Sequence, residues 1–298
     1  MTDPGPARSE IRLIRAASTP PPALPPPDLP VELDALAPPR IPPLRGIRAA
    51  LFDVYGTLFV SAAGEIGAAE SSQTGPVPDR LAALAGEHSC SATELRDYFR
   101  AAVLERHEAL RGKTAYPELR VEELWAEFLV RRGESSGGAR ELALRYELAV
   151  NPAYPMPAAA EALALLRSRG FVLGLISNAQ FFTPLLFEAF FGAPPEALGF
   201  DSGLLIYSFA LGEAKPSPNL FVPAARRLEA LGLKPENALY VGNDMLNDIA
   251  AASRAGFKTA LFAGDRRSLR LREGDQRTAE IMPDRVLRSL GDLSGLVA

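Results

Sequence analysis

Apolar runs and helical patterns alternate along the second half of the chain. Four short apolar runs predict buried strands: Phe171–Ile176, Leu204–Phe209, Ala238–Val241 and Thr259–Phe262. Three stretches with helical spacing, each followed by a glycine, lie before or between them: Pro157–Arg169, Pro218–Leu231 and Met245–Ala255. Strands that alternate with helices of this length predict parallel β-α-β units in one sheet.

A further strand is predicted from Ile47 to Asp53, and a helical region separates it from the others. In this region Ser91 and Glu94 form the S-x-x-E pattern of a capping box. The predicted helices of the region are Asp79–Gly86, Ser91–Leu110, Val121–Arg132 and Ala139–Val150. We therefore predict an α/β fold, a doubly wound parallel sheet interrupted after its first strand by a helical insertion.

The first 45 residues differ in composition from the rest and hold 13 of the chain's 27 prolines. Proline lacks a backbone N–H and has a fixed φ, so this segment predicts a disordered or polyproline tail without helix or strand. Only Val31–Leu36 is expected to dock locally on the main body. We expect a solvated extension; the alternative is a segment that binds a proline-recognising partner.

The composition excludes several classes of protein. A net charge of −4 and a pI near 5.5 give no reason to expect a nucleic-acid partner. No apolar run reaches the roughly 18 residues of a membrane-spanning helix, and the N-terminus lacks the apolar core of a signal peptide. The single cysteine, Cys90, cannot form an internal disulfide. These features predict a soluble, cytoplasmic protein.

Polar residues follow four of the predicted strands. Asp53 ends the first, Ser177-Asn178 the second and Asn243-Asp244 the fourth, and the third leads to Lys215. In an open parallel sheet, ligands bind beyond the carboxyl ends of the strands. A carboxylate there can attack phosphorus or carbon, lysine and serine can stabilise the charge that develops, and further carboxylates can hold Mg²⁺. Such a set suits phosphoryl transfer.

These motifs, in this order, resemble those of the haloacid dehalogenase superfamily over roughly residues 47–290. Asp53-Val54-Tyr55-Gly56-Thr57 is similar to its first motif, Ser177 to the second, Lys215-Pro216 to the third and Gly242–Asp248 to the fourth. The resemblance implies a Rossmann-like core (residues 46–59 and 156–298) and a helical cap (residues 60–155) that selects the substrate. It also implies that Asp53 forms a covalent intermediate, which Lys215 and Ser177 stabilise, with Thr57 and Asn178 beside them.

Two departures from the family pattern leave two reactions open. Phosphatases of the family carry a general acid two residues after the nucleophile, where this chain has Tyr55, as in the 2-haloacid dehalogenase branch. The fourth motif, in contrast, has Asp244 and Asp248, which suit a metal-dependent phosphatase. The longer family spacing would put Asn243 at the ligand position; we favour Asp244, because a charged ligand binds Mg²⁺ better than an amide.

The first hypothesis is thus an Mg²⁺-dependent phosphatase of a small metabolite, with Asp53, Asp244 and Asp248 as metal ligands. The second is a 2-haloacid dehalogenase that needs no metal, for which Arg100, Arg106 and Arg111 are candidate cap arginines. The third is a weakly active or inactive scaffold protein that uses the proline-rich segment. The basic run Arg266–Arg272 is expected to be a solvated loop and helix. The sequence does not predict the substrate or the oligomeric state.

Overall fold

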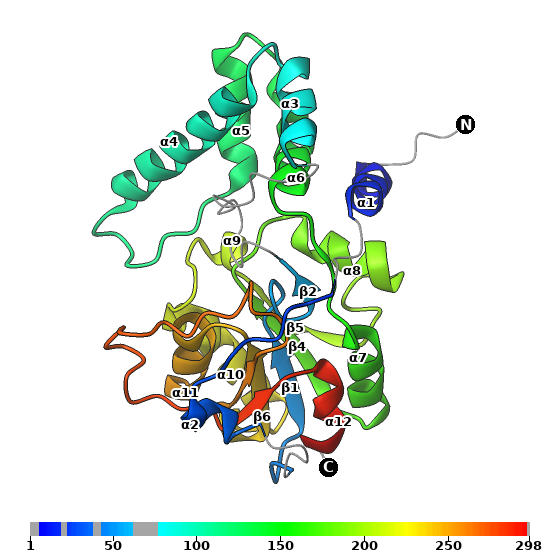
Figure 1. Cartoon of the computed structure of the whole chain (residues 1–298), viewed down its shortest axis with the longest axis vertical. Helices are drawn as coiled ribbons and strands as arrows, with labels where there is room; N and C mark the ends of the chain where they lie inside the picture. Colours follow the sequence, from blue (N-terminus) through cyan, green and yellow to red (C-terminus); the bar gives the residue numbers. More distant parts are fainter. Residues whose placement is uncertain (1–5, 19–22, 38–42, 62–76, 297–298) are drawn as a thin grey trace.

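A parallel six-stranded sheet forms the centre of the computed structural model, which describes residues 6–18, 23–37, 43–61 and 77–296 (Figure 1). The strand order is β5-β4-β1-β6-β7-β8. The strands are β1 (Ala49–Phe52), β4 (Val172–Ser177), β5 (Phe200–Tyr207), β6 (Ala238–Gly242), β7 (Lys258–Phe262) and β8 (Arg285–Leu287). The chain starts at β1, adds two strands on one side and then three on the other. This order confirms the predicted doubly wound fold and makes β1 the switch point.

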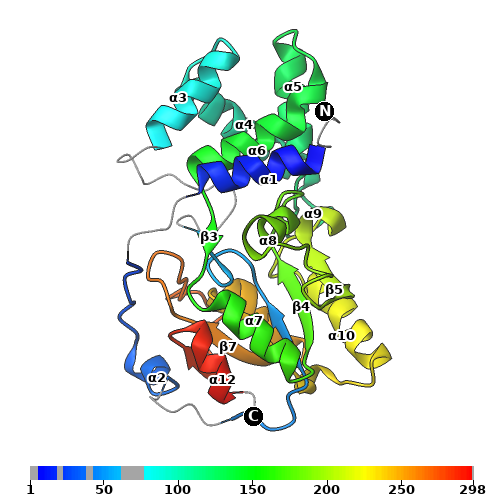
Figure 2. The same ribbon diagram turned by 90° about the vertical axis from the view of Figure 1, so that its right-hand side faces the viewer.

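Helices cover both faces of this sheet. Along β1, Ala50 and Phe52 pack into one apolar cluster, and Ala49 and Leu51 into another. The first cluster includes residues of α7 (Ala159–Ser168), α8 (Thr183–Phe191) and α12 (Leu293–Leu296); the second includes residues of α10 (Phe221–Ala230) and α11 (Ala251–Arg254). In Figure 2, α7 and α12 lie on one side of the strands and α10 on the other. Burial on both faces explains the unbroken apolar runs in the sequence.

Residues 77–150 form a separate helical block above the sheet (Figure 1). Its helices are α3 (Val77–Glu87), α4 (Ala92–Leu110), α5 (Val121–Arg131) and α6 (Ala139–Val150). The capping box predicted at Ser91 is present at the start of α4. Trp125, nearly fully buried, stacks on Phe99 with ring centroids 5.7 Å apart. All four helices were predicted; residues 62–76, at the predicted start of the insertion, lie outside the described residues.

Two backbone connections join the block to the sheet. The short strands β2 (Phe59–Val60) and β3 (Tyr154–Pro155) pair antiparallel where the chain enters and leaves the block. In addition, the loop of residues 113–120 between α4 and α5, which we call the docking loop, bonds to residues 212–214. Ala214 N donates to Tyr116 O (2.8 Å) and Glu118 N donates to Gly212 O (3.1 Å). The docking loop is therefore attached immediately before Lys215.

The prediction that residues 1–45 form no helix is wrong for two stretches. Helix α1 (Pro6–Ala17) lies between the helical block and α8, as Figure 2 shows. Ile11 and Ile14 are buried there, and Arg15 Nε donates to Ala189 O of α8 (2.6 Å). A helix is compatible with this stretch because its single proline, Pro6, stands in the first turn, where the missing N–H breaks no intrahelical hydrogen bond. Residues 1–5, 19–22 and 38–42 lie outside the described residues.

The second stretch confirms the local docking predicted for Val31–Leu36. Helix α2 (Val31–Asp34) places Leu33 in an apolar cluster with Met245 and Ile249 of the sheet domain. Val286 N of β8 donates to Leu36 O (3.0 Å), and Asp34 forms an ion pair with Arg288. The N-terminal segment thus contacts the sheet domain at α2 and both the sheet domain and the block at α1.

Several elements differ from the predictions in detail. The third predicted strand begins four residues earlier, at Phe200, and its end is replaced by the short helix α9 (Ser208–Leu211). Strand β8 and helix α8 were not predicted, because Arg285–Leu287 is too short for a recognisable pattern and α8 is apolar almost all round. The 3-10 turns are Ser136–Gly138, Pro218–Leu220, Pro235–Asn237 and Leu290–Asp292. No helix of the described residues is both long and apolar enough to span a membrane.

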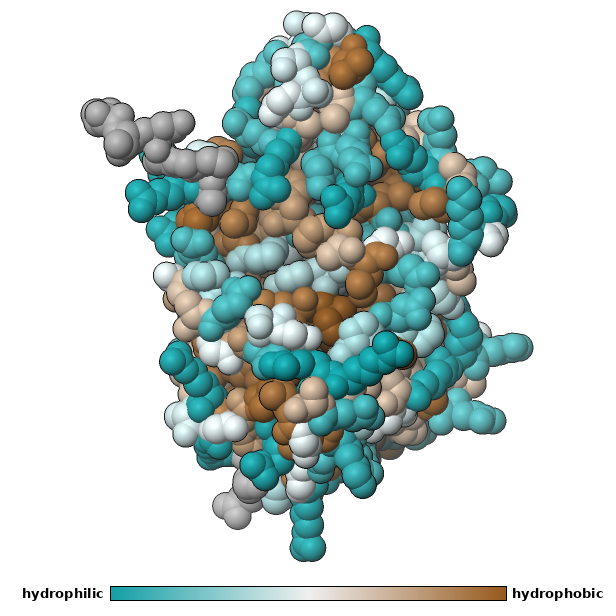
Figure 3. Space-filling view, turned by 180° about the vertical axis from the view of Figure 1, so that it is seen from behind, coloured by the Kyte–Doolittle hydropathy of each residue, from teal (hydrophilic) through white to brown (hydrophobic). Residues whose placement is uncertain are grey.

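Figure 3 shows the molecule from behind, coloured by hydropathy. Hydrophilic side chains dominate this face, and hydrophobic ones gather in smaller areas between them. This distribution agrees with a core that is enclosed between the sheet and its helices.

Candidate active site at the carboxyl edge of the sheet

The loop after β1 brings Asp53 to the edge of the sheet. Asp53 N donates to Val241 O of the neighbouring strand β6 (2.9 Å), and this hydrogen bond fixes the position of the Asp53 backbone. Gly56 has φ +82°, and a Cβ atom there would lie 2.6 Å from Asn243 Nδ2. Glycine is therefore required at this position. Thr57 is fully buried, and its Oγ1 donates to Asn243 Oδ1 (3.0 Å).

Lys215 joins two carboxylates at this edge. Its Nζ donates to Asp53 Oδ1 (2.7 Å) and to Asp248 Oδ1 (2.6 Å). All three residues are buried, with at most 7% of any of them exposed. Burial alone would lower the pKa of Lys215, but the negative charges of Asp248 and Asp53 outweigh it and raise that pKa. Lys215 therefore stays positively charged between the two carboxylates.

Asp248 and Tyr240 hold this lysine in place. Tyr240 OH donates to Ile176 O (2.7 Å), and Lys215 Nζ donates to Tyr240 OH (3.2 Å). Burial raises the pKa of the Asp248 carboxyl, and the Lys215 charge opposes this rise. Asp248 Oδ2 accepts from Asp244 N (2.9 Å), which ties it to the turn after β6. Tyr240 was not singled out in the sequence; its signal was a polar group inside an apolar strand.

The second predicted motif contacts Lys215 through the backbone. Asn178 Oδ1 accepts from Lys215 N (2.7 Å), so Asn178 fixes the segment that carries the lysine. Ser177 is fully buried, and its Oγ donates to Asn178 O (3.2 Å). The structure therefore brings Asp53, Lys215 and Asp248 into direct contact, with Asn178 bonded behind the lysine.

Tyr55 is buried beside this cluster, with 3% of its surface exposed. Its hydroxyl and Thr183 Oγ1 are hydrogen-bonded at 3.0 Å. Burial raises the pKa of Tyr55 well above its ordinary value, and the negative charge of Glu147 from the helical block raises it further. Tyr55 is thus a neutral phenol that gives up its proton less readily than a free tyrosine. Glu147 and Thr183 were not identified from the sequence.

The turn after β6 directs its two polar residues to different partners. Asn243 Nδ2 donates to Ser268 O (2.6 Å), while its Oδ1 accepts from Thr57. Asp244 caps the π-helical turn Met245–Ala250 and pairs with Arg272. Arg272 belongs to the basic run that was predicted to be solvated. That prediction is wrong in two respects: residues 266–272 form turns and no helix, and the run is not fully solvated, because Ser268 is 1% exposed and Arg272 pairs with Asp244.

The three predicted metal ligands are not gathered around one point. Asp53 and Asp248 both face Lys215, whereas the Asp244 carboxylate faces Arg272. Within the part of the chain that the structure describes, no group of three or more His, Cys, Asp or Glu side chains is arranged to hold a metal ion. In this arrangement the donor set does not fit Mg²⁺, which requires several oxygen ligands around it.

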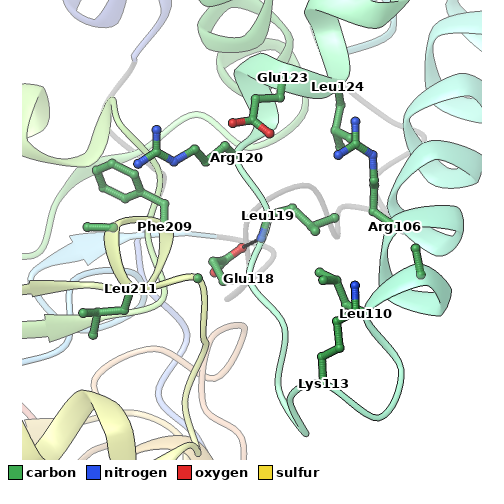
Figure 4. Close-up of a pocket in the computed structure, with 13 residues that line it drawn as sticks. Arg106, Leu110, Lys113, Glu118, Leu119, Arg120, Glu123, Leu124, Phe209 and Leu211 are labelled. Atoms are coloured by element: carbon green, nitrogen blue, oxygen red, sulfur yellow. Dashed lines mark hydrogen bonds between the residues drawn. The ribbon is translucent and has the colours of Figure 1, made fainter.

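A cavity of about 470 Å³ lies between the helical block and α9 (Figure 4). Arg106, Lys113 and Arg120 line it together with apolar side chains such as Phe209 and Leu211. Of the candidate cap arginines, Arg106 pairs with Glu127 and Arg111 with Glu108, both within the block. None of the predicted catalytic residues is among the described residues that line this cavity. The residues that line this cavity therefore do not include those of the Asp53 site.

The doubly wound sheet and its charged carboxyl edge define an α/β enzyme with a strand-end site. A family model described as haloacid dehalogenase-like hydrolase matches residues 47–256. The match covers more than half of the chain and all four motifs. The chain therefore belongs to the haloacid dehalogenase-like hydrolases, as the motifs predicted.

Curated relatives match shorter segments. The phosphoglycolate phosphatase of Aquifex aeolicus is 39% identical over 107 residues, which are 36% of this chain and 46% of that protein. The phosphoserine phosphatase of Thermus thermophilus is 34% identical over 161 residues, or 51% of this chain and 61% of that protein. The matched segments span from 22% to 61% of the relatives' own lengths.

A solved structure agrees in fold. The 2-haloacid dehalogenase from Pseudomonas syringae pv. Tomato DC3000 superposes with a TM-score of 0.52 and 23% identity, over 83% of this chain and 96% of that one. At this identity the similarity concerns the fold alone, so it does not distinguish dehalogenation from phosphate hydrolysis.

Proposed function

We propose that this chain hydrolyses a small phosphorylated metabolite and that Asp53 is its nucleophile. The observation that carries the proposal is the contact of Lys215 Nζ with both Asp53 Oδ1 (2.7 Å) and Asp248 Oδ1 (2.6 Å) at the carboxyl edge of the sheet. The phosphatase names of the curated relatives support phosphorus, over carbon, as the atom attacked.

The proposed reaction has two steps. Lys215 holds Oδ1 of Asp53, so the other oxygen, Oδ2, attacks phosphorus, and the bond from phosphorus to the leaving alcohol breaks. The resulting acyl phosphate on Asp53 is then cleaved by water, which releases inorganic phosphate and restores the carboxylate. The Lys215 ammonium offsets the combined negative charge of the nucleophile and the phosphoryl group in both steps.

The neighbouring residues have supporting roles in this proposal. Asp248 and Tyr240 keep Lys215 in position, and Asn178 holds its backbone. The Ser177 hydroxyl binds a phosphoryl oxygen after it rotates away from Asn178 O. Thr57 fixes the Asp53 loop through Asn243. No step uses a metal ion, because the Asp244 carboxylate is held by Arg272.

The helical block is proposed to act as a cap that selects the substrate. It is joined to the sheet domain at β2 and β3 and by the docking loop, which bonds to residues 212–214 just before Lys215. Glu118 of this loop accepts from Ser208 Oγ (2.6 Å), and Ser208 Oγ in turn accepts from Ala179 N (2.8 Å). The docking loop therefore contacts the segment that precedes Lys215, and Ser208 links this loop to the segment that follows Asn178.

Proton donation to the leaving group is the weak point of this site. Tyr55 stands where family phosphatases have an acid, and its phenol is hydrogen-bonded to Thr183 with a raised pKa. An alkoxide leaving group then departs with little assistance. We expect kcat to depend steeply on the pKa of the leaving group, which a series of substituted phenyl phosphates measures. Tyr55→Phe should keep this dependence; a shallower dependence in the wild type than in Tyr55→Phe would assign the donor role to Tyr55.

The experiment that tests the function is a phosphatase screen of the purified chain against a broad panel of phosphate esters, with and without Mg²⁺ and EDTA. Asp53→Asn should lose the activity, since an amide is a poor nucleophile. Asp275→Asn is the matched control, because Asp275 forms a surface ion pair with the nearby Arg277. Phosphate release that survives Asp53→Asn would rule out the proposed nucleophile.

A second candidate function is 2-haloacid dehalogenation, which the buried Tyr55 favours. A halide leaves without a proton, so a site that lacks a proton donor suits it. Lys215 would then offset the charge of Asp53 while the carbon–halogen bond breaks. Halide release from 2-chloropropionate in EDTA, absent in Asp53→Asn, would decide for this reaction; phosphate release with no halide release would decide against it.

A further inference from the structure

The carboxylate of Asp244 is already paired with a cation that the protein supplies. Asp244 Oδ1 accepts hydrogen bonds from Leu246 N (2.8 Å) and Asn247 N (3.0 Å). Arg272 Nε lies 3.1 Å from both carboxylate oxygens, and Nη2 of the same guanidinium also contacts Oδ2. The Asp244 side chain is only 9% exposed, so this two-pronged contact is partly shielded from water.

Backbone hydrogen bonds join the segment before Arg272 to the turn after β6. Met245 N donates to Arg270 O (2.9 Å), and Arg270 N donates to Asn243 O (2.9 Å). Arg272 itself has φ +57°, a left-handed conformation that residues other than glycine rarely adopt. Such a conformation persists only where the surroundings enforce it. The backbone of this segment therefore fixes the Arg272 guanidinium next to Asp244.

A divalent cation at Asp244 would compete with this guanidinium. Mg²⁺ binds oxygen ligands at about 2.1 Å in near-octahedral geometry and needs lone pairs that are not used by other donors. Both oxygens of Asp244 face Arg272, and Asp248 accepts from Lys215 and from Asp244 N. Two cations at one carboxylate also repel each other. Two of the three carboxylates that the family resemblance assigns to Mg²⁺, those of Asp244 and Asp248, thus already accept from the chain's own donors.

We propose that Arg272 takes the place of the divalent cation at the end of β6. Asp244 is then neutralised from within the protein, and the chain does not bind Mg²⁺ at this carboxylate. The proposal rests on the site of the proposed hydrolase, but it does not depend on the reaction, because metal binding is measured directly. A failed activity screen would leave it unaffected.

The test is a titration of the full chain with Mn²⁺, followed by electron paramagnetic resonance and calorimetry. Arg272→Met should bind one Mn²⁺ at least about tenfold more tightly than the wild type. Adding Asp244→Asn should abolish this gain. Arg277→Met is the matched control, since it removes a nearby arginine that pairs with Asp275, and it should bind Mn²⁺ as the wild type does. MgCl₂ should raise the melting temperature of Arg272→Met alone among these proteins.

Equal Mn²⁺ affinity in the wild type and in Arg272→Met would overturn the proposal, as would a gain that persists with Asp244→Asn. Should Arg272→Met not fold, Arg272→Gln replaces it, because the amide keeps a hydrogen bond to Asp244 without the charge. The same gain and the same dependence on Asp244 are then expected, and their absence counts against the proposal.

Discussion

The strand-end site and the N-terminal segment are assembled in opposite ways. In the site, Asp53 and Lys215 are 162 residues apart in sequence, yet each follows a strand of the same parallel sheet. Asp53 follows β1, and Lys215 lies in the segment after β5, which β4 separates from β1. Helix α1 belongs to no sheet. Its position depends on individual side chains: Ile14 in the apolar cluster, Arg15 on α8, and Glu10, which pairs with Arg140 of α6. Topology places the first region, and side-chain packing places the second.

Asp53→Asn should have the largest effect on the strand-end site. If the site acts through this carboxylate, kcat/KM should fall by about ten thousandfold, because nothing else in the cluster replaces a lost nucleophile. The melting temperature should stay close to that of the wild type, since Lys215 keeps Asp248 as a partner. A large loss of stability with retained activity would mean that Asp53 serves the fold and not the chemistry.

Lys215→Met should have the largest effect on stability. Methionine fills the same space but leaves Asp53 and Asp248 buried without their shared cation, which costs about 3–5 kcal/mol. Urea unfolding measures this change. Lys234→Met, which removes a lysine from an exposed pair with Glu236, is the matched control and should be neutral. The double variant Lys215→Met, Asp248→Asn should regain part of the lost free energy of unfolding, because it has one buried charge fewer. If it regains none, the charge argument is wrong.

Ile14→Ala tests whether α1 is a packed element or a loosely attached one. Ile14 is fully buried, so the substitution should lower the free energy of unfolding by about 2 kcal/mol or more if α1 unfolds with the rest of the chain. Arg12→Ala, at an exposed position on the same helix, should change little. An Ile14→Ala variant as stable as the wild type would show that α1 detaches independently, and the contrast between the two regions would then be greater.

The smallest expected effect is that of Glu10→Gln. Glu10 is buried, but Arg140 is half exposed, so the pair should contribute no more than about 1 kcal/mol. The variant should release α1 more often, which limited proteolysis of the N-terminal segment would detect before equilibrium unfolding does. Glu32→Gln, on the exposed side of α2, is the control. Equal cleavage rates for the two variants would show that the ion pair does not hold α1.

Much of the fold was predictable because the decisive signals are local. Ser91 and Glu94 are three residues apart and mark the start of α4 without any knowledge of the tertiary structure. The strands were recognisable because burial on both faces leaves unbroken apolar runs. Once the strands were assigned, the parallel topology predicted that Asp53 and Lys215 would meet.

The remaining features depend on contacts that no local pattern encodes. Arg272 lies 28 residues after Asp244 in a run that reads as an ordinary basic loop, and only the folded segment shows that its guanidinium reaches the carboxylate. Helix α1 was not recognised because the prediction was based on the proline content of all 45 residues. Most of these prolines lie after Ala17, whereas Ile11 and Ile14 have the i, i+3 spacing of a helix face. The average proline content of 45 residues thus concealed a helix of 12 residues.

The contact between the docking loop and residues 212–214 contains two amide groups that can report its opening. The amide hydrogens of Glu118 and Ala214 are bonded across the contact between the helical block and the sheet domain, to Gly212 O and Tyr116 O. Lys215 N, one residue further on, is bonded within the sheet domain to Asn178. In hydrogen–deuterium exchange, the first two amides should exchange whenever the block separates from the sheet domain, and the third amide should exchange more slowly. The ratio of these rates would measure how often the contact between the helical block and the sheet domain opens.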